Sequence, residues 1–357
     1  MKKIQWKYTV ILGCILLLLT LGLSETAFAQ KGKPLVLRVA HLSSAIGTGP
    51  EYLQKAAREI EKLTEGQLKF EFYWSESLVK TKEMPKAIQR GVCDIAWTAA
   101  SYHPAEVPLW THSRTLLFHP NGDDAGYITR KTWMLFDSSK DLQGDYEKIG
   151  QTAWFCTPYD SYVLFSKKIV KNLEDMKGLR IRVSGEEPAK MMKAIGAHAT
   201  FIPAPETYTA LEKGIVDGGL AGWEWGKRYA LYEVVPYVVD TRVSIGYAFF
   251  NVSLATLKKM SEKDRKTFLQ VGRRVSIELG DAQRKEREDY KKFMQDKGVK
   301  VLPFLDAERQ KWADIPAVKA LPKEWIERQN AAKRPGAKVM REFLTIFEVP
   351  HWMPAGY

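Results

Sequence analysis

Residues 179–217 read LRIRVSGEEPAKMMKAIGAHATFIPAPETYTALEKGIVD, and this stretch alternates short apolar runs with helical patterns. The elements that these patterns predict are, in order, a strand (Leu179–Val183), a helix (Glu187–Ile195, closed by Gly196), a strand (Ala199–Pro203), a helix (Glu206–Lys213, closed by Gly214) and a strand from Ile215 onward. Strands that alternate with helices in this way indicate a parallel sheet.

The same order of elements occurs earlier in the chain. The predicted elements there are a strand (Leu35–His41), a helix (Thr48–Leu63), a strand (Leu68–Trp74), a short helix (Lys82–Arg90) and a strand (Val92–Thr98). Residues 87–94, AIQRGVCD, also echo residues 210–217, ALEKGIVD, at the same point of each unit. The echo predicts two similar lobes.

Other segments are predicted to join the lobes. Gln151–Ser166 is typical of a long strand between them, and Arg242–Leu254 of a second crossing. A long helix is predicted from the capping pattern at Ser261 to about Lys297, followed by amphipathic helices in the tail around Ala307–Asp314 and Pro322–Phe347.

The N-terminus has the pattern of an export signal. Lys2, Lys3 and Lys7 precede an almost wholly apolar run from Val10 to Leu23, and Ala27-Phe28-Ala29 follows. We expect a signal peptide over residues 1–29, cleavage after Ala29 and a periplasmic protein. The alternative is an uncleaved anchor helix.

Composition limits the functional classes. The 357 residues are 45% hydrophobic and 27% charged, which is typical of a soluble globular protein and is long enough for two modest domains. The net charge of +12 comes from basic residues interleaved with acids. For an exported chain this favours a solvated surface with a bias toward anionic partners, and we expect no nucleic-acid partner.

These observations predict an α/β protein with the two-lobed fold of periplasmic binding proteins, in which hinged lobes share crossing strands and a long helix lies in the C-terminal half. The first lobe is expected over residues 30–157 and about 243–285, and the second over about 158–242 and 286–357, with the C-terminal helices. In such sheets the ligand lies beyond the carboxyl ends of the strands, where loops of both lobes converge.

The cysteine and histidine pattern favours no metal or cofactor. Cys93 and Cys156 remain in the mature chain, as a disulfide or as two buried thiols, and no zinc-like spacing occurs.

One series of motifs extends through the second unit. It runs MKGLRIRV (176–183), AIGA (194–197), Pro203, ETYTAL (206–211), GIVDG (214–218) and YEV (232–234), and LTEG (63–66) with Glu83 and Gly91 extends it to the first unit. In this order and spacing the chain resembles the substrate-binding proteins of tripartite ATP-independent periplasmic (TRAP) transporters, the DctP type of the dicarboxylate transporter family. The resemblance implies a secreted protein that closes on a small organic acid and docks on a membrane permease of a small and a large subunit.

Arg182 matches the carboxylate-binding arginine of that family. It lies near the end of a predicted parallel strand, before a turn that opens a helix, and its guanidinium offers a planar fork to a carboxylate. The alternative is a structural arginine paired with an acid. Arg180 has the same strand parity and is the weaker candidate.

The segment GGLAGWEW (218–225) is the second candidate region. It lacks the asparagine that sugar-acid-binding relatives carry there, which argues against a sialic-acid-type ligand. Trp223 and Trp225 are candidates for an aromatic wall and Glu224 for a hydrogen-bond acceptor, with core packing and solvation as the alternatives.

Strand ends and loops supply the remaining ligand-binding candidates. They are Ser43 and Ser44 in the first strand–helix loop, Trp97 and Thr98 at the end of the third strand, Tyr159 and Tyr162 on the crossing strand, and His41 and Phe249, for which a core role is the ordinary explanation. Some relatives place a second arginine on the crossing strand, and none stands between Trp154 and Lys167 here. One carboxylate clamp therefore favours monocarboxylates over dicarboxylates.

No enzyme is predicted, because the sequence contains neither GxSxG nor a phosphate-binding GxxxxGK loop. The rival functions are a binding protein of an ATP-driven importer and a protein that presents ligand to a sensor.

Overall fold

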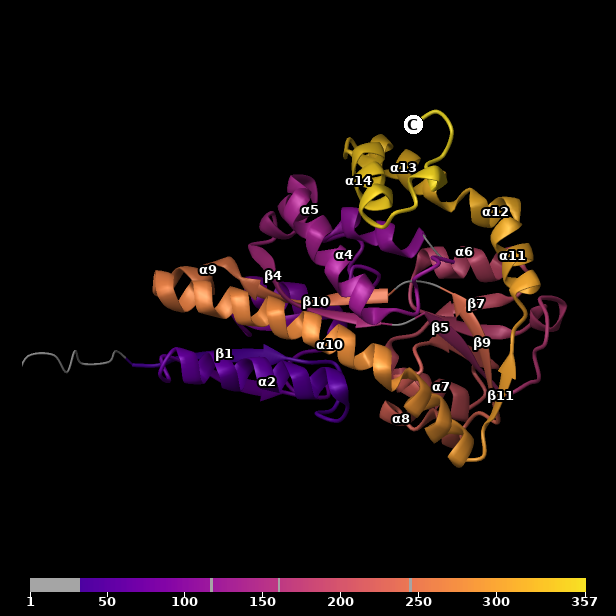
Figure 1. Ribbon diagram of the computed structural model, residues 1–357, viewed down its shortest axis with the longest axis horizontal. Helices are drawn as coiled ribbons and strands as arrows, with labels where there is room; N and C mark the ends of the chain where they lie inside the picture. The colour runs from indigo at the N-terminus through magenta and orange to yellow at the C-terminus, as the bar shows by residue number, and fades with distance from the viewer. Residues whose placement is uncertain (1–32, 116–117, 160, 244–245) are drawn as a thin grey trace, which may run out of the picture.

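The computed structural model describes residues 33–115, 118–159, 161–243 and 246–357. The predicted signal peptide and its cleavage site lie outside the described residues. Figure 1 shows two α/β lobes side by side, each built on its own sheet. Within the described residues, no helix combines the length and the apolarity that crossing a membrane requires.

The first lobe contains a five-stranded sheet. Its strands, in spatial order, are β2 (Leu68–Tyr73), β1 (Leu35–Ala40), β3 (Ile95–Thr98), β10 (Gly246–Ser253) and β4 (Gln151–Tyr159). The first three strands are parallel, and β10 is antiparallel to both β3 and β4. The helices α2 (Thr48–Leu63), α3 (Met84–Gln89), α4 (Ala125–Ser138), α5 (Lys140–Glu147) and α9 (Leu254–Lys258) belong to this lobe, with short 3-10 turns at η1 (Thr81–Glu83) and η2 (Pro108–Thr115).

The second lobe repeats this topology with one strand added at its edge. Its order is β7 (His198–Phe201), β6 (Arg180–Val183), β8 (Gly218–Ala221), β5 (Tyr162–Ser166), β9 (Tyr237–Val243) and β11 (Lys300–Pro303). The strands β7, β6 and β8 are parallel, and β5 is antiparallel to both β8 and β9. The helices α6 (Glu186–Ala194), α7 (Thr207–Glu212) and α8 (Glu224–Arg228) pack here, with short turns at η3 (Glu174–Met176), η4 (Ala204–Glu206) and η5 (Leu231–Glu233). The predicted two-lobed fold is confirmed.

The sequence echo corresponds to one structural turn that occurs in both lobes. A carboxylate oxygen of Asp94 accepts hydrogen bonds from the backbone N–H and Nε of Arg38, at 3.0 and 3.2 Å. Asp217 does the same for Arg180, at 2.9 and 3.1 Å. Each carboxylate accepts a backbone N–H group, of Arg38 or of Arg180, that a carbonyl of the neighbouring strand would otherwise accept. The strands β3 and β8 therefore each begin three residues later than predicted.

The crossing strands exchange between the two sheets. The predicted long strand over residues 151–166 is two strands, since β4 pairs within the first sheet and β5 within the second. β9 and β10 make the return crossing in the same manner. β4 is the edge strand of the first sheet and β5 lies inside the second, whereas β9 lies between β11 and β5 in the second sheet and β10 lies inside the first.

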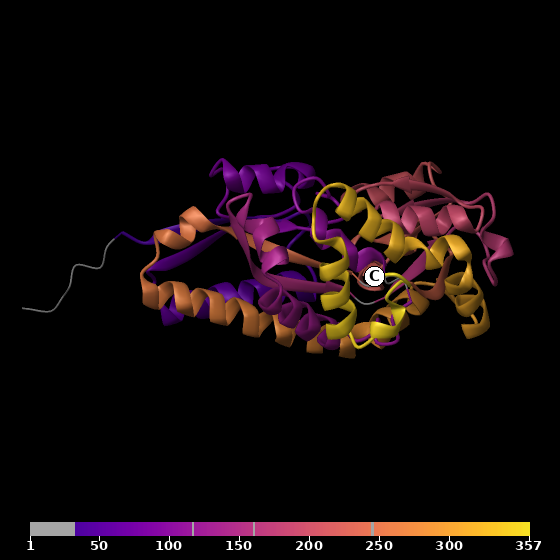
Figure 2. The ribbon, with the colours of Figure 1, turned by 90° about the horizontal axis from the view of Figure 1, so that it is seen from above.

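The helix α10 (Glu262–Asp296) extends along both lobes, as Figures 1 and 2 show. The Ser261 hydroxyl accepts the Asp264 N–H at 3.0 Å, which confirms the predicted start of the helix. At about 1.5 Å per residue its 35 residues span about 50 Å. Phe268, Val275 and Leu279 are buried along its first half, and Met294 near its end packs against Gly226 in α8.

The C-terminal helices divide between the lobes. They are α11 (Asp306–Asp314), α12 (Pro316–Lys319), α13 (Leu321–Ala331) and α14 (Gly336–Ile346), followed by a turn at η6 (Pro350–Trp352). Trp325 and Phe343 join a cluster with Trp110 and Ile128 of the first lobe, whereas the predicted boundaries grouped residues 286–357 with the second. The amphipathic pattern of a tail helix specifies a buried face but not the lobe that covers it.

Cys93 and Cys156 are both buried free thiols. They lie in two different hydrophobic clusters, and burial raises the pKa of Cys93 to about 12. Of the two alternatives that the sequence left open, the structure therefore has the buried thiols.

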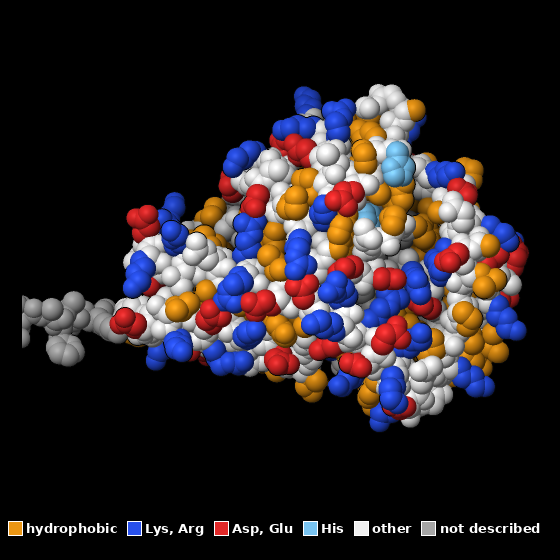
Figure 3. All heavy atoms as spheres, in the orientation of Figure 1, with side chains coloured by type: hydrophobic (Ala, Val, Ile, Leu, Met, Phe, Trp, Pro, Cys, Tyr) orange, Lys and Arg blue, Asp and Glu red, His pale blue; other side chains and the backbone are white. Residues whose placement is uncertain are grey.

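On the face shown in Figure 3, basic and acidic side chains are interspersed. Ion pairs link α10 to its neighbours, such as Lys55 with Glu278 at 2.8 Å and Arg130 with Asp281 at 2.6 Å. The basic side chains on this face are therefore not gathered into one patch.

Candidate ligand-binding site

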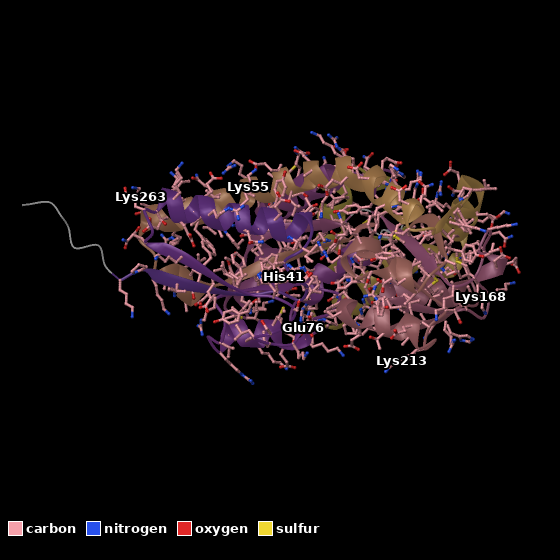
Figure 4. The ribbon with its side chains drawn as sticks, turned by 90° about the horizontal axis from the view of Figure 1, so that it is seen from below. His41, Lys55, Glu76, Lys168, Lys213 and Lys263 are labelled. Atoms are coloured by element: carbon pink, nitrogen blue, oxygen red, sulfur yellow. The ribbon has the colours of Figure 1, made fainter. Side chains whose placement is uncertain are left out.

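A cavity lies between the lobes, lined by residues from both. The first lobe contributes residues that follow β1 and β3, together with Thr157 and Tyr159 of β4, and the second contributes Ser184 and residues around α8. In Figure 4 the label of His41 marks the middle of the molecule, where the lobes meet, whereas Lys168 and Lys213 lie at the far end of the second lobe. This is the expected position beyond the strand ends.

Arg182 lies beside this cavity with no exposed surface. Its Nε donates to the carbonyl oxygen of Ile202 at 2.8 Å, and Nη1 donates to that of Leu220 at 2.9 Å. Among the described residues, no carboxylate forms an ion pair with Arg182. Two neutral backbone carbonyls therefore orient a buried guanidinium whose charge has no local acid to balance it.

Two aromatic residues connect Arg182 to the cavity. The Tyr102 hydroxyl accepts from Nη2 of Arg182 at 3.2 Å and from the Ala204 N–H at 3.1 Å. The guanidinium carbon lies 4.7 Å from the centre of a Trp225 ring. Both Tyr102 and Trp225 line the cavity, so the positive charge lies one side chain behind its wall.

The three candidates in residues 223–225 have separate environments. Trp225 lines the cavity. Trp223 is 1% exposed and does not line it, so its place is the core. Glu224 is buried behind the wall, where Oε2 accepts from Nη2 of Arg228 at 2.8 Å, and burial raises the pKa of Glu224 while Arg228 lowers it.

Arg228 is a cavity residue that the sequence analysis missed. Its side chain is 8% exposed, and its Nε has no hydrogen-bond partner within the described part of the chain. It lies close to the first lobe, because a Cβ added at Gly49 would stand 3.3 Å from its Nη2. The spacing from Glu224 to Arg228, i to i+4, is the signal that could have identified it as that acid's partner.

His41 lines the cavity as a neutral ring. Burial, with the charge of Arg228 second, lowers the pKa of His41 to about 3. The Ser43 backbone N–H donates to Nδ1 of His41 at 2.9 Å, so the ring proton is on Nε2. Ser43 does not line the cavity itself, and it affects the cavity only by orienting the His41 ring.

Three other predicted residues line the cavity together. They are Trp97, Tyr159 and Tyr162. The Trp97 indole N–H donates to the Tyr159 hydroxyl at 3.2 Å, which fixes both rings. Phe250 and Tyr229 add further rings to the wall.

Three predicted residues lie elsewhere. Ser44 is half-buried in the loop after β1 and is not a lining residue. Thr98 donates to the Phe249 carbonyl at 3.2 Å, and the Phe249 ring packs on Trp110 and Trp133. Strand parity explains the difference, because Phe249 and its neighbour Phe250 face opposite sides of the sheet and only Phe250 faces the cavity.

The charges around the cavity sum to one positive charge. Arg228 is the only charged side chain among the described lining residues, and Glu224 balances it. His41 is neutral, so the uncompensated charge is that of Arg182. In the described residues, no cluster of three or more histidine, cysteine or acidic side chains could hold a metal ion.

Comparison with known proteins yields one family. A family model described as DctP, bacterial extracellular solute-binding protein, family 7, matches residues 39–328. A curated solute-binding protein of Albidiferax ferrireducens is 26% identical over 262 residues, which are 72% of this chain and 76% of that protein.

Solved structures are similar over most of the chain. An extracytoplasmic solute receptor of Bordetella pertussis that binds pyroglutamic acid superimposes with a TM-score of 0.76 at 20% identity, covering 88% of this chain and 99% of the other. A marine metagenome TRAP solute-binding protein specific for aromatic acids, in complex with metahydroxyphenylacetate, superimposes with a TM-score of 0.78 at 19% identity over 88% and 98% of the two chains.

Proposed function

The chain belongs to the bacterial extracellular solute-binding proteins of family 7, the DctP family, and from this premise we propose that it captures a small monocarboxylate and delivers it to a TRAP permease in the membrane. The proposed location is the periplasm, after removal of residues 1–29. The protein acts by binding and release and is not an enzyme.

The observation that carries the proposal is the unbalanced charge of Arg182. A buried guanidinium without an acid partner is costly unless an anion completes the site. A carboxylate supplies one negative charge and two acceptor oxygens in the plane of the fork. Because the cavity has one net positive charge, a singly charged acid fits better than a dicarboxylate.

The wall supports a flat or cyclic ligand body. Aromatic rings from both lobes surround the cavity, among them Trp97, Tyr159 and Trp225. Such rings bind apolar and π surfaces well. The similar receptors that bind pyroglutamic acid and metahydroxyphenylacetate both take cyclic monocarboxylates, which agrees with this chemistry.

Hinge closure is the proposed mechanism. The cavity walls come from both lobes, and Arg228 of the second lobe packs on Gly49 of the first. A ligand that touches both walls favours the closed arrangement by its differential affinity. The permease then receives the closed form.

A thermal-melt screen of the mature protein against a broad carboxylate panel, with uncharged analogues, tests the proposal. An acid at about 100 times its dissociation constant stabilises the protein by about 2.7 kcal/mol, which is a shift of several degrees. Arg182→Ala should weaken binding by at least about tenfold, because the carboxylate loses its buried partner. Arg182→Lys should also bind worse, because the planar fork is lost.

Arg180→Ala is the matched control. Arg180 lies on the same strand with the same parity, but it is exposed and paired with Asp217 at 2.9 Å. Its replacement should leave the affinity unchanged. Stabilisation by sugars, amino acids or metals and by no acid would instead favour the binding protein of an ATP-driven importer.

A further inference from the structure

Four residues that line the cavity each carry a buried polar atom with no hydrogen-bond partner in the described part of the protein. These atoms are Oγ of Ser101, Oγ1 of Thr157, Oγ of Ser184 and Nε of Arg228. Leaving such groups unpaired costs free energy, so a cavity that gathers them is suited to a polar ligand.

The four atoms form two groups. A Cβ added at Gly185 would stand 3.2 Å from the Cβ of Ser101, so Ser101 lies against the turn that contains Ser184. A Cβ added at Gly49 would lie 3.3 Å from Nη2 of Arg228 and 3.9 Å from Cγ2 of Thr157. Nη2 of Arg228 and the methyl group of Thr157 therefore both face α2, which brings these two side chains together from different lobes.

The Arg228 group has a specific chemistry. A guanidinium only donates hydrogen bonds, and here its charge is already balanced by Glu224. A second carboxylate at this point would meet the negative charge of Glu224. A neutral oxygen acceptor would satisfy Nε without that repulsion, and the Thr157 hydroxyl can donate to or accept from the same group.

We propose that Arg228 and Thr157 form a second recognition point, which binds a neutral oxygen on the ligand body away from its carboxylate. The ligand is then a monocarboxylate that also carries a hydroxyl or carbonyl oxygen, neither a plain hydrocarbon acid nor a dicarboxylate. This inference rests on the proposed function, in which Arg182 takes the carboxylate.

Matched pairs of acids within the carboxylate panel test the inference by calorimetry. One pair is 3-hydroxyphenylacetate and phenylacetate, and another is 3-oxocyclopentanecarboxylate and cyclopentanecarboxylate. In the unmodified protein, the oxygenated acid of at least one pair should bind at least about ten times more tightly than the plain acid. The plain acid leaves Nε of Arg228 without a hydrogen-bond partner.

Two variants remove the recognition point. Thr157→Val deletes the hydroxyl at nearly constant volume, and Arg228→Gln combined with Glu224→Gln removes both charges of the pair together. Each should reduce the preference to about threefold or less, because the oxygenated acid loses more affinity than the plain acid does. Arg58→Gln is the control, since Arg58 is exposed and is not among the residues that line the cavity.

The outcomes separate the two proposals. If acids bind but the preference is absent, or persists unchanged in both variants, the inference is overturned and the proposed function stands. If no carboxylate of the panel binds, the proposed function fails and the inference with it. If the double variant melts at a much lower temperature, Thr157→Val alone decides.

Discussion

Two guanidinium groups near one cavity are stabilised in different ways. Arg182 is oriented by backbone carbonyls and keeps its charge available, whereas Arg228 shares its charge with Glu224. Burying either guanidinium without partners would destabilise the folded protein. The hydrogen-bond and ion-pair partners of each side chain therefore decide which ligand group it can bind. The first is suited to an anion and the second to a neutral oxygen.

Trp225 should position Arg182. Its ring lies under the guanidinium at 4.7 Å, and a cation–π contact of this kind contributes about 0.5–2 kcal/mol. We expect Trp225→Leu to weaken acid binding by about 3- to 30-fold, and Trp225→Phe, which keeps a ring, by less. Calorimetry with the best acid of the panel measures both. Equal losses in the two variants would mean that the ring face has no part in positioning the guanidinium.

At the level of single residues, the sequence predicted part of the cavity. Arg182, His41, Trp97, Tyr159, Tyr162 and Trp225 all line it or lie directly behind its wall. Ser101 and Tyr102 were missed because they lie in an irregular loop after β3, where periodicity gives no signal. Phe249 was named and Phe250 was missed, because strand parity becomes informative only once one residue of the strand has been placed.

Among the structural elements, most helices and parallel strands followed from periodicity and capping residues. α2 has the predicted bounds, and α10 begins at its predicted cap. The crossing segments were less predictable, because a strand-like segment of 16 residues does not record which sheet each half joins. The antiparallel pairing of β10 with β3 and β4 is likewise set by tertiary contacts alone.

The crossing of α4 and α10 depends on glycine at one point. A Cβ at Gly280 would stand 2.7 Å from the Ala125 carbonyl oxygen and 3.0 Å from the Gly126 Cα, both backbone atoms that cannot move away easily. Overpacking costs about 1–3 kcal/mol, and contact with fixed backbone atoms puts this site in the upper part of that range, above the roughly 1 kcal/mol that alanine gains over glycine inside a helix. Gly280→Ala should therefore lower the Tm by about 2–6 °C.

Gly144 in α5 provides the opposite case. A Cβ there would meet nothing within 4 Å, so Gly144→Ala should raise the Tm by about 1–3 °C through helix propensity alone. Thermal unfolding of the two variants measures both signs. A stabilised Gly280→Ala protein would mean that the two helices can separate at little cost.

At the scale of the whole molecule, the two lobes share one turn, one strand order and two exchanged strands. The apolar residues Trp325 of α13 and Phe343 of α14 pack in the first lobe, while Arg328 of α13 pairs with Glu186 of α6 in the second, and neither contact has a counterpart in the repeat. The internal echo thus predicted the common plan, whereas the differences arise from segments outside the repeat.

Acid stability should depend on buried histidines distributed over the first lobe and its interfaces. Burial lowers the pKa of His41 to about 3 and of His112 to about 4, and it lowers the pKa of His103 and His119 as well. At a pH between the folded and unfolded pKa values of a buried histidine, the unfolded chain binds more protons than the folded one. The free energy of unfolding is therefore undiminished above pH 6.5 and decreases as the pH falls toward about 4. Asp145 acts in the opposite sense, because burial raises its pKa to about 6.

The pH dependence of the Tm of single variants separates these groups. His112 is fully buried and packs against Phe343 at 4.3 Å, so His112→Phe keeps a ring and removes one site that must stay neutral. Its Tm should fall less steeply than that of the unmodified protein between pH 6.5 and about 4.5, whatever its value at neutral pH. His351→Phe is the control, because His351 is exposed. If the His112→Phe curve runs parallel to the unmodified one, buried histidines do not set the acid limit, and the carboxylates of the surface ion pairs become its cause.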